Sequence, residues 1–454
     1  PLLSVNPENG ERLAAYDEHR PDEVARILDE SVAAFRAGRE ASFAERAAWL
    51  TRAAGLLEER QHDLARLMAL EMGKPLAQGR AETLKCASAC RYYAAEAEGA
   101  LAPESVATDA TRSLVVHRPL GVVLAVMPWN FPLWQVFRFA APALMAGNAG
   151  LLKHSSNVTG CALAIEELLH AAGVPTGLFR TLRLSSPRVA GLIASPQVAA
   201  VTLTGSTPAG RAVAAAAGQA LKKTVLELGG SDPYVVLADA DLPAAAEACA
   251  VARLVNSGQS CIAGKRFIVV AEVAGSFERL FAERLAARRL GSALEEGVDI
   301  GPQARPDLRD ELHGQVQRSL ERGARLVLGG RRPEGPGAFY PATLLADVRP
   351  GTAAFDEETF GPVAALSVAR DEAQALELAN RSSFGLGAAV FTRDAARGER
   401  LAVDALEAGS CFVNTFVRSD PRLPFGGIKE SGYGRELGPW GLREFVNVKT
   451  VYVK

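Results

Sequence analysis

The chain has 454 residues, 48% of them hydrophobic, and 50 basic against 52 acidic residues leave a formal charge of −2. This length allows two or three domains with sizeable cores, and a balanced charge without like-charged runs gives no reason to expect nucleic acid or an anionic membrane as a partner. No stretch approaches the roughly twenty apolar residues of a membrane span, and the start lacks the pattern of a signal peptide, so we expect a cytoplasmic protein. The six cysteines have no regular spacing, which favours reduced thiols over a disulfide framework.

Helices are predicted for residues 21–100. Apolar residues recur at helical spacing from Val24 to Phe35, and a second apolar stripe runs from Trp49 to Leu57. The segment TRSLVVHRP, residues 111–119, predicts an exposed strand instead.

The centre of the chain alternates between strands and helices. Apolar, strand-like runs lie at residues 121–127, 149–153, 198–203 and 224–228, with helical segments at 160–172 and 209–220. This alternation is typical of the βαβ units of a doubly wound α/β sheet.

After Gly230 the α/β pattern starts again, which predicts a second domain over residues 230–415. Strands are expected near 233–237, 265–270 and 388–391, and helices near 244–255 and 276–287. The final segment, FVNVKTVYVK, predicts a strand that pairs with another edge, and a neighbouring subunit is one candidate partner.

Two familiar ligand signals are absent. The sequence has no G-x-G-x-x-G fingerprint, and the stretch from Gly205 to Gly210 lacks the Lys and Ser or Thr of a phosphate-binding loop. Cys86 and Cys90 share a helix face, but no nearby His or Cys cluster completes a zinc site, so we predict packing roles for them and no metal.

Three residues in separate segments form a chemically complete set. Cys261 stands in a Gly- and Ser-containing loop, Glu227 ends an apolar strand before Gly-Gly, and Asn130 lies in the rigid turn PWNFP. Singly, each is more often a packing thiol, a surface carboxylate or a turn residue. Together they supply a thiolate nucleophile, a base for water and an amide donor for an oxyanion. A thioester hydrolase would use the same set, so a cofactor site must discriminate.

The segments PWNFP, LELGG, GQSC and EETFGP, in this order, resemble the NAD(P)-dependent aldehyde dehydrogenase superfamily, and the similarity covers essentially the whole chain. The resemblance implies that Cys261 is the nucleophile, Glu227 the base for deacylation, and Asn130 the oxyanion donor beside the backbone N–H of Cys261. It also implies a Rossmann-like cofactor-binding domain, an α/β catalytic domain and a small β oligomerisation element. The corresponding residues are 1–110 with 120–229, then 230–415, and finally 111–119 with 440–454.

The resemblance also implies a dinucleotide site that does not need the missing fingerprint. Trp129 and Lys153 match positions on the adenosine side, Gly205 and Ser206 match the pyrophosphate loop at a helix N-terminus, Glu358 would hold the nicotinamide ribose, and Phe360 would pack by the ring.

Within the superfamily the chain looks most like the succinate-semialdehyde dehydrogenases, in which an Arg and a Ser hold the distal carboxylate of the substrate. Arg138 and Ser419 match those positions, whereas Val255 replaces a second Arg found in some members and Ala263 replaces a Cys. An ion pair within the protein is the alternative role for Arg138.

Under the resemblance, the choice between NAD and NADP depends on one position. NAD-preferring members often carry a Glu three residues after the matched Lys, and Ser156 stands there, which favours NADP, with NAD as the alternative. The expected partners are a small aldehyde and further copies of the chain, as a dimer or tetramer. Other readings are an aldehyde dehydrogenase of different or broad range, a non-catalytic relative and a thiol hydrolase.

Overall fold

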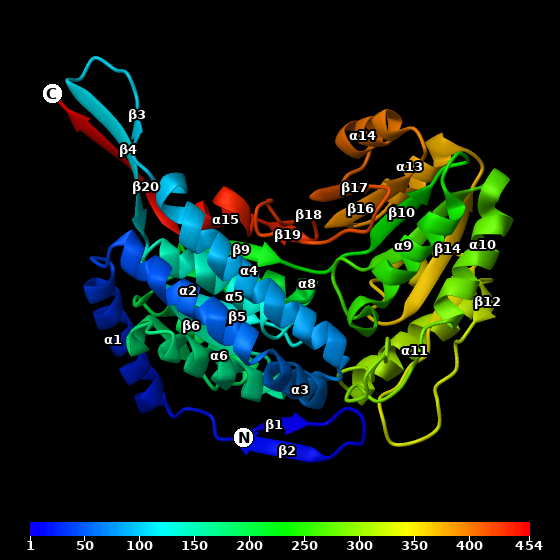
Figure 1. Cartoon of the computed structure of the whole chain (residues 1–454), viewed down its shortest axis with the longest axis horizontal. Helices are drawn as coiled ribbons and strands as arrows, with labels where there is room; N and C mark the ends of the chain where they lie inside the picture. Colours follow the sequence, from blue (N-terminus) through cyan, green and yellow to red (C-terminus); the bar gives the residue numbers. More distant parts are fainter.

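The structure is a computed structural model that describes residues 1–454, and its chain begins with a hairpin and a layer of helices. The hairpin strands are β1 (Leu2–Val5) and β2 (Arg12–Tyr16). The helices, which confirm the predicted helical segment, are α1 (Pro21–Gly38), α2 (Phe43–Glu59), α3 (Gln61–Met72) and α4 (Leu76–Ala100). Figure 1 shows them beside the first sheet, and α4 packs against α2, α3 and α5.

The first sheet has six strands in the order β19-β9-β8-β5-β6-β7. Its parallel strands are β5 (Val122–Met127), β6 (Ala149–His154), β7 (Phe179–Thr181), β8 (Val198–Thr204) and β9 (Lys223–Glu227), and β19 (Gly432–Tyr433) adds an antiparallel edge. The connecting helices are α5 (Trp134–Met145), α6 (Thr159–Ala171), α7 (Val189–Ala194) and α8 (Thr207–Gln219).

The order of these strands indicates where a ligand would bind. The chain moves from β5 outward to β6 and β7, then returns to β8 on the other side of β5. In doubly wound sheets, ligands bind at the carboxyl ends of the strands where the order reverses in this way. The residues after Met127, Thr204 and Glu227 lie at those ends.

The second sheet has seven strands in the order β12-β13-β14-β11-β10-β16-β17, all in parallel pairs except β12 with β13. The strands are β10 (Asp232–Val236), β11 (Gly264–Val270), β12 (Arg325–Leu328), β13 (Thr343–Ala346), β14 (Val363–Ala369), β16 (Gly387–Phe391) and β17 (Ser410–Val413). Its helices are α9 (Leu242–Leu254), α10 (Ala271–Ala286), α11 (Pro306–Glu321), α12 (Ala353–Asp356), α13 (Glu372–Asn380) and α14 (Ala395–Asp404).

A small sheet projects from the body at the upper left of Figure 1. It contains β3 (Glu104–Ser105), β4 (Arg112–Pro119) and β20 (Val446–Val453), in the order β20-β4-β3, and β20 follows α15 (Gly438–Glu444). The final strand is present as predicted, but its edge partner is β4 of the same chain, over the full length of both strands. Two short strands, β15 (Phe384–Gly385) and β18 (Ile428–Lys429), form a further two-stranded sheet.

The predicted α/β fold class is confirmed, and α5 is the most deeply buried of the helices that were not predicted. Every residue of α5 is buried, so the helix has no solvent-exposed face, and Pro142 lies inside it, where a proline argues against a helix. A helix buried on all sides is hard to distinguish from a buried strand by periodicity.

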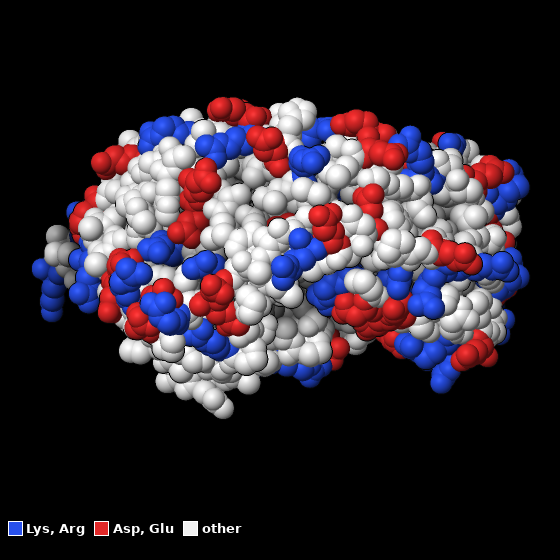
Figure 2. All heavy atoms as spheres, turned by 90° about the horizontal axis from the view of Figure 1, so that it is seen from below, with Lys and Arg blue, Asp and Glu red and all other residues white.

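The surface agrees with the balanced composition. Figure 2 shows acidic and basic side chains interspersed over one face of the molecule, without a large region of one sign. No helix combines the length and the apolar character that crossing a membrane requires.

Candidate active site

The loop before Cys261 has an unusual backbone. It follows the short 3-10 helix η4 (Val255–Gly258), in which Asn256 and Ser257 both have a φ of 55° and Gly258 has a φ of 77°. A Cβ on Gly258 would lie 2.3 Å from the carbonyl carbon of Gly361, so glycine lets this loop reach the EETFGP segment. Left-handed backbone at two non-glycine residues is costly and persists only where surrounding contacts hold it.

Side-chain contacts supply that support. The amide of Asn256 donates hydrogen bonds to the carbonyl oxygens of Asn130 (2.6 Å) and Gln259 (3.0 Å), and Ser257 Oγ accepts one from the N–H of Gly301 (2.9 Å). Asn256 thereby joins the nucleophile loop to the PWNFP turn, so that two motifs far apart in the sequence are fixed against each other.

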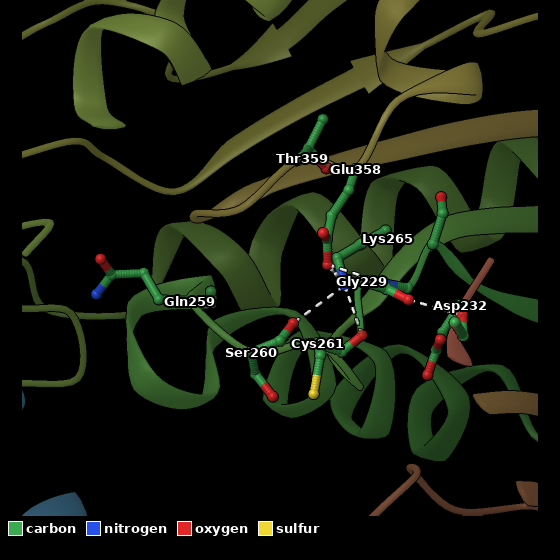
Figure 3. Close-up of polar contacts among 12 residues, drawn as sticks. Gly229, Asp232, Gln259, Ser260, Cys261, Lys265, Glu358 and Thr359 are labelled. Atoms are coloured by element: carbon green, nitrogen blue, oxygen red, sulfur yellow. Dashed lines mark hydrogen bonds and ion pairs between the residues drawn. The ribbon is translucent and has the colours of Figure 1, made fainter. Parts of the chain in front are cut away.

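Lys265, at the start of β11, is a site residue that sequence reasoning missed. Its buried Nζ donates to the carbonyl oxygens of Ser260 (3.0 Å) and Cys261 (2.7 Å) and lies 3.2 Å from Oε1 of Glu358 (Figure 3). One ammonium group therefore fixes both the backbone of the nucleophile and the predicted ribose-binding carboxylate. In the sequence it precedes the apolar run of a strand, where a lysine gives no sign of this contact.

Two N–H groups near Cys261 are free of protein acceptors. The amide of buried Asn130 donates one hydrogen bond from Nδ2 to Gln259 O (3.1 Å), and its Oδ1 accepts one from Gln135 Nε2 (2.9 Å). These contacts fix the orientation of the amide and leave its second N–H free. The backbone N–H of Cys261 makes no hydrogen bond within the protein. Such preorganised donors stabilise the oxyanion of a tetrahedral intermediate.

The thiol of Cys261 is half-buried, and burial raises its pKa to about 12. The positive charges of Arg138 and Lys265 oppose this shift, while Glu227 and Glu358 add to it. Burial therefore favours the neutral thiol, whereas the thiolate is the nucleophilic form of a cysteine.

Glu227 ends β9 and is buried, with no hydrogen-bond partner on either carboxylate oxygen. Burial raises its pKa well above the ordinary value, a shift that Arg138 opposes and Glu436 increases. Glu227 lines neither of the cavities that meet at Cys261; its Oε1 lies beside Gly426, where an added Cβ would be 2.7 Å away. The structure thus places the predicted base close enough to affect the Cys261 pKa, but with its carboxylate packed away from the cavities.

A cleft of about 660 Å³ opens on one side of Cys261 and brings six other predicted residues together. They are Trp129, Asn130, Gly205, Ser206, Glu358 and Phe360. The rings of Trp129 and Phe360 meet edge to face with centroids 5.7 Å apart, and Ser206 is the N-cap of α8, where its Oγ accepts from Ala209 N (3.5 Å).

This cleft fits a dinucleotide on its donor set. The N-terminus of α8 offers N–H groups and a favourable dipole to a pyrophosphate, and Glu358 offers a carboxylate to ribose hydroxyls. Lys153 and Ser156 lie apart from the cleft lining, at the end of β6 and the start of the 3-10 helix η1 (Ser156–Val158). Burial lowers the pKa of Lys153, whose Nζ donates to Ser186 Oγ (3.3 Å), and Ser156 is exposed.

A smaller cavity of about 110 Å³ lies on the other side of Cys261 and contains both predicted substrate residues, Arg138 and Ser419. Arg138 is buried and forms an ion pair with Glu436, and its Nη2 donates to Thr204 Oγ1 (3.2 Å). Ser419 Oγ accepts a hydrogen bond of 2.7 Å from Lys85, a cavity residue that the sequence did not single out.

Comparison with known proteins identifies the family. The model of the aldehyde dehydrogenase family matches residues 2–451, and the chain belongs to this family. It is 49% identical to a probable NADP-dependent succinate-semialdehyde dehydrogenase of Synechocystis, with 100% of this chain and 99% of that protein covered. It is 46% identical to the Escherichia coli K12 succinate semialdehyde dehydrogenase [NAD(P)+] Sad, covering 99% and 97%. The crystal structure of the Streptococcus pyogenes succinic semialdehyde dehydrogenase with NADP⁺ matches with a TM-score of 0.97. The two sequences are 34% identical, and the match covers 100% of each chain.

Proposed function

We propose that this protein oxidises succinate semialdehyde to succinate, with NADP as the preferred acceptor and NAD as the alternative. The observation that carries the proposal is the position of Cys261, which lies between a cleft suited to a dinucleotide and a cavity that contains the cations Arg138 and Lys85. A carboxylate at the far end of a short aldehyde complements such a cavity. The relatives named above carry the same activity in their names.

In the first half of the reaction, the thiolate of Cys261 attacks the aldehyde carbon to give a tetrahedral hemithioacetal. The second N–H of the Asn130 amide and the backbone N–H of Cys261 stabilise its oxyanion, because both are free of protein acceptors. Gly205, Ser206, Glu358 and the Trp129–Phe360 pair would hold the dinucleotide, which supplies the hydride acceptor when bound.

In the second half, water hydrolyses the thioester on Cys261. We assign the deprotonation of this water to Glu227, because a raised pKa makes a carboxylate a stronger base. In the present arrangement Glu227 lies outside both cavities, so this role requires its side chain to turn toward Cys261. The buried neighbours Arg138 and Glu436 determine how readily Glu227 gives up its own proton.

The preference for NADP rests on Ser156. This exposed, neutral side chain offers no charge to repel a 2′-phosphate, and Lys153, which has no ion pair, supplies a positive charge three residues earlier.

The main alternative, a thioester hydrolase, needs no dinucleotide cleft, and a non-catalytic relative needs neither Cys261 nor a free oxyanion donor. An aldehyde dehydrogenase of broad range needs no cationic end to its substrate cavity. The combination of these features in one site therefore supports the proposed reaction over each alternative.

The decisive experiment is a panel of aldehydes assayed with NADP and with NAD, following the absorbance of the reduced nicotinamide. Succinate semialdehyde with NADP should give the highest kcat/KM. A preference for butanal would reject the substrate, and thioester hydrolysis without reduced nicotinamide would reject the dehydrogenase.

We also propose a homo-oligomer in the cytoplasm. The edge strand β20 exposes Val448, Tyr452 and Val453 on the projecting sheet, an apolar edge suited to contact with another copy. All six cysteines are free, which suits a reducing compartment. Light scattering would give the mass of the assembly, and truncation before Val446 should reduce it to that of a monomer.

A further inference from the structure

Lys85, on α4, is one of the cations that line the small cavity, and the two half-reactions described above assign it no role of its own. It lines the small cavity beside Cys261 and also an adjoining cavity of about 400 Å³, which shares Phe131, Trp134 and Val255 with the small one. Its Nζ lies 4.3 Å from the centroid of the Trp134 ring and donates to Ser419 Oγ (2.7 Å). The ammonium group therefore stands where the two cavities meet.

No carboxylate neutralises this ammonium group. Glu82, one turn earlier on α4, is in an ion pair with Lys74 and accepts from the N–H groups that begin α5. Asp420, next to Ser419 in the chain, is bound by both arms of Arg422. Lys85 is thus a largely enclosed cation whose nearby acids are committed elsewhere.

Arg138 differs from Lys85 in this respect. It forms a buried ion pair with Glu436, and its guanidinium lies 4.8 Å from the Phe425 ring centroid. Its charge is already compensated within the protein, so it offers less net attraction to an anionic substrate than an unpaired cation does.

We propose that Lys85 determines the specificity of this enzyme for aldehydes with a distal carboxylate, which it binds together with Ser419. An ammonium enclosed without a counterion is unfavourable, and a substrate carboxylate would supply both the missing charge and an acceptor. Ser419 orients Lys85 in the free enzyme and can donate its hydroxyl to the same carboxylate. The inference deepens the proposed function and rests on it.

The test is Lys85→Met, which keeps the length and apolar stem of the side chain and removes the charge. KM for succinate semialdehyde should rise about ten- to a hundredfold, the usual effect of losing a charge-assisted hydrogen bond. The kinetic constants for butanal, which has no carboxylate, should change less than threefold. Lys85→Arg should restore part of the loss, because it restores the charge with a different geometry.

A binding measurement separates this role from a structural one. Titration of succinate into the cofactor-free protein by calorimetry should show a similar loss of affinity in Lys85→Met, with an unchanged melting temperature. Arg91→Met is the matched control, because it also removes one positive charge from α4. Arg91 lies outside the two cavities that Lys85 lines and forms an ion pair with Glu58. It should leave succinate binding and both KM values within twofold.

Arg138→Met provides the contrasting variant. It leaves Glu436 buried without its partner, so it should lower the melting temperature and reduce activity toward both aldehydes. Equal losses on both aldehydes in Lys85→Met, or no loss on either, would overturn the role of Lys85. If the wild type itself prefers butanal, the proposed substrate fails first, so the two failures are distinguishable.

Discussion

The two cavities that meet at Cys261 are built in different ways. The cleft of about 660 Å³, to which we assign the dinucleotide, is lined by short motifs at the ends of strands in the first sheet and by the EETFGP segment. The cavity of about 110 Å³, to which we assign the substrate, is closed by side chains from distant helices and loops, and its Lys85–Ser419 hydrogen bond joins residues 334 positions apart.

The two cavities show that chemistry and specificity depend on different features of the sequence. The reacting groups lie in compact motifs, since a nucleophile loop and an oxyanion donor need a defined local backbone, as at Asn256 and Ser257. Substrate preference depends on how separate elements meet, which no single motif states.

The largest expected effect comes from removing the group shared by both cavities. Cys261→Ala should lower aldehyde oxidation by about a thousandfold or more, because the covalent route depends on the thiolate. Steady-state rates with NADP would measure the loss, and dinucleotide binding, followed by fluorescence, should persist because the cleft remains. Retained oxidation would remove Cys261 from the reaction.

Glu227→Gln should separate the two half-reactions, because it should slow only the second. Attack and hydride transfer should continue, while hydrolysis of the thioester slows by about a hundred- to ten-thousandfold, the range of general base catalysis. Stopped-flow measurement should show a burst of reduced nicotinamide near one per active site, followed by slow turnover. Normal turnover without a burst would contradict the assignment of Glu227 as base.

The sequence predicts the cofactor side more completely than the substrate side. Four of the six strands of the first sheet and three of the seven strands of the second could be predicted from periodicity, and contiguous motifs identified Cys261 and six other residues that line the cleft. Lys85, Lys265 and Glu436 were missed, because each acts through partners distant in the sequence. Arg138 lies in the small cavity beside Cys261, and its pairing with Glu436 became visible only in the folded structure.

Ser156→Glu tests whether this position discriminates between NADP and NAD. A carboxylate at this exposed position, near the adenosine end of the predicted site, would repel a 2′-phosphate, so KM for NADP should rise about tenfold or more. KM for NAD, which lacks that phosphate, should change little or fall. Ser156→Ala, which removes the hydroxyl without adding a charge, is the matched control and should leave both KM values within about twofold. An equal loss for both cofactors would argue against a role of Ser156 in discrimination.

The smallest expected effect is the pH dependence of KM for succinate semialdehyde, which follows from the charge on Lys85. Burial, with a further contribution from Arg138, lowers the pKa of Lys85 to about 8, so this side chain loses its positive charge as the pH rises through that value. Other charged or titratable groups around it lie on its own helix, in the loop that contains Ser419 and along both cavities that it lines, namely Glu82, Cys86, Cys261, Arg288, Asp299, Arg418 and Asp420.

A distal carboxylate stays ionised throughout this range, so only the cation changes. KM for succinate semialdehyde should therefore rise by up to about tenfold between pH 7 and pH 9. Titration of the Cys261 thiol affects every aldehyde alike, so the ratio of the KM values for succinate semialdehyde and butanal isolates the contribution of Lys85. In Lys85→Met the ratio should start high and stay constant with pH, and in the wild type it should approach the variant's value as the pH increases. A wild-type ratio that stays constant with pH would show that the charge on Lys85 does not select the substrate.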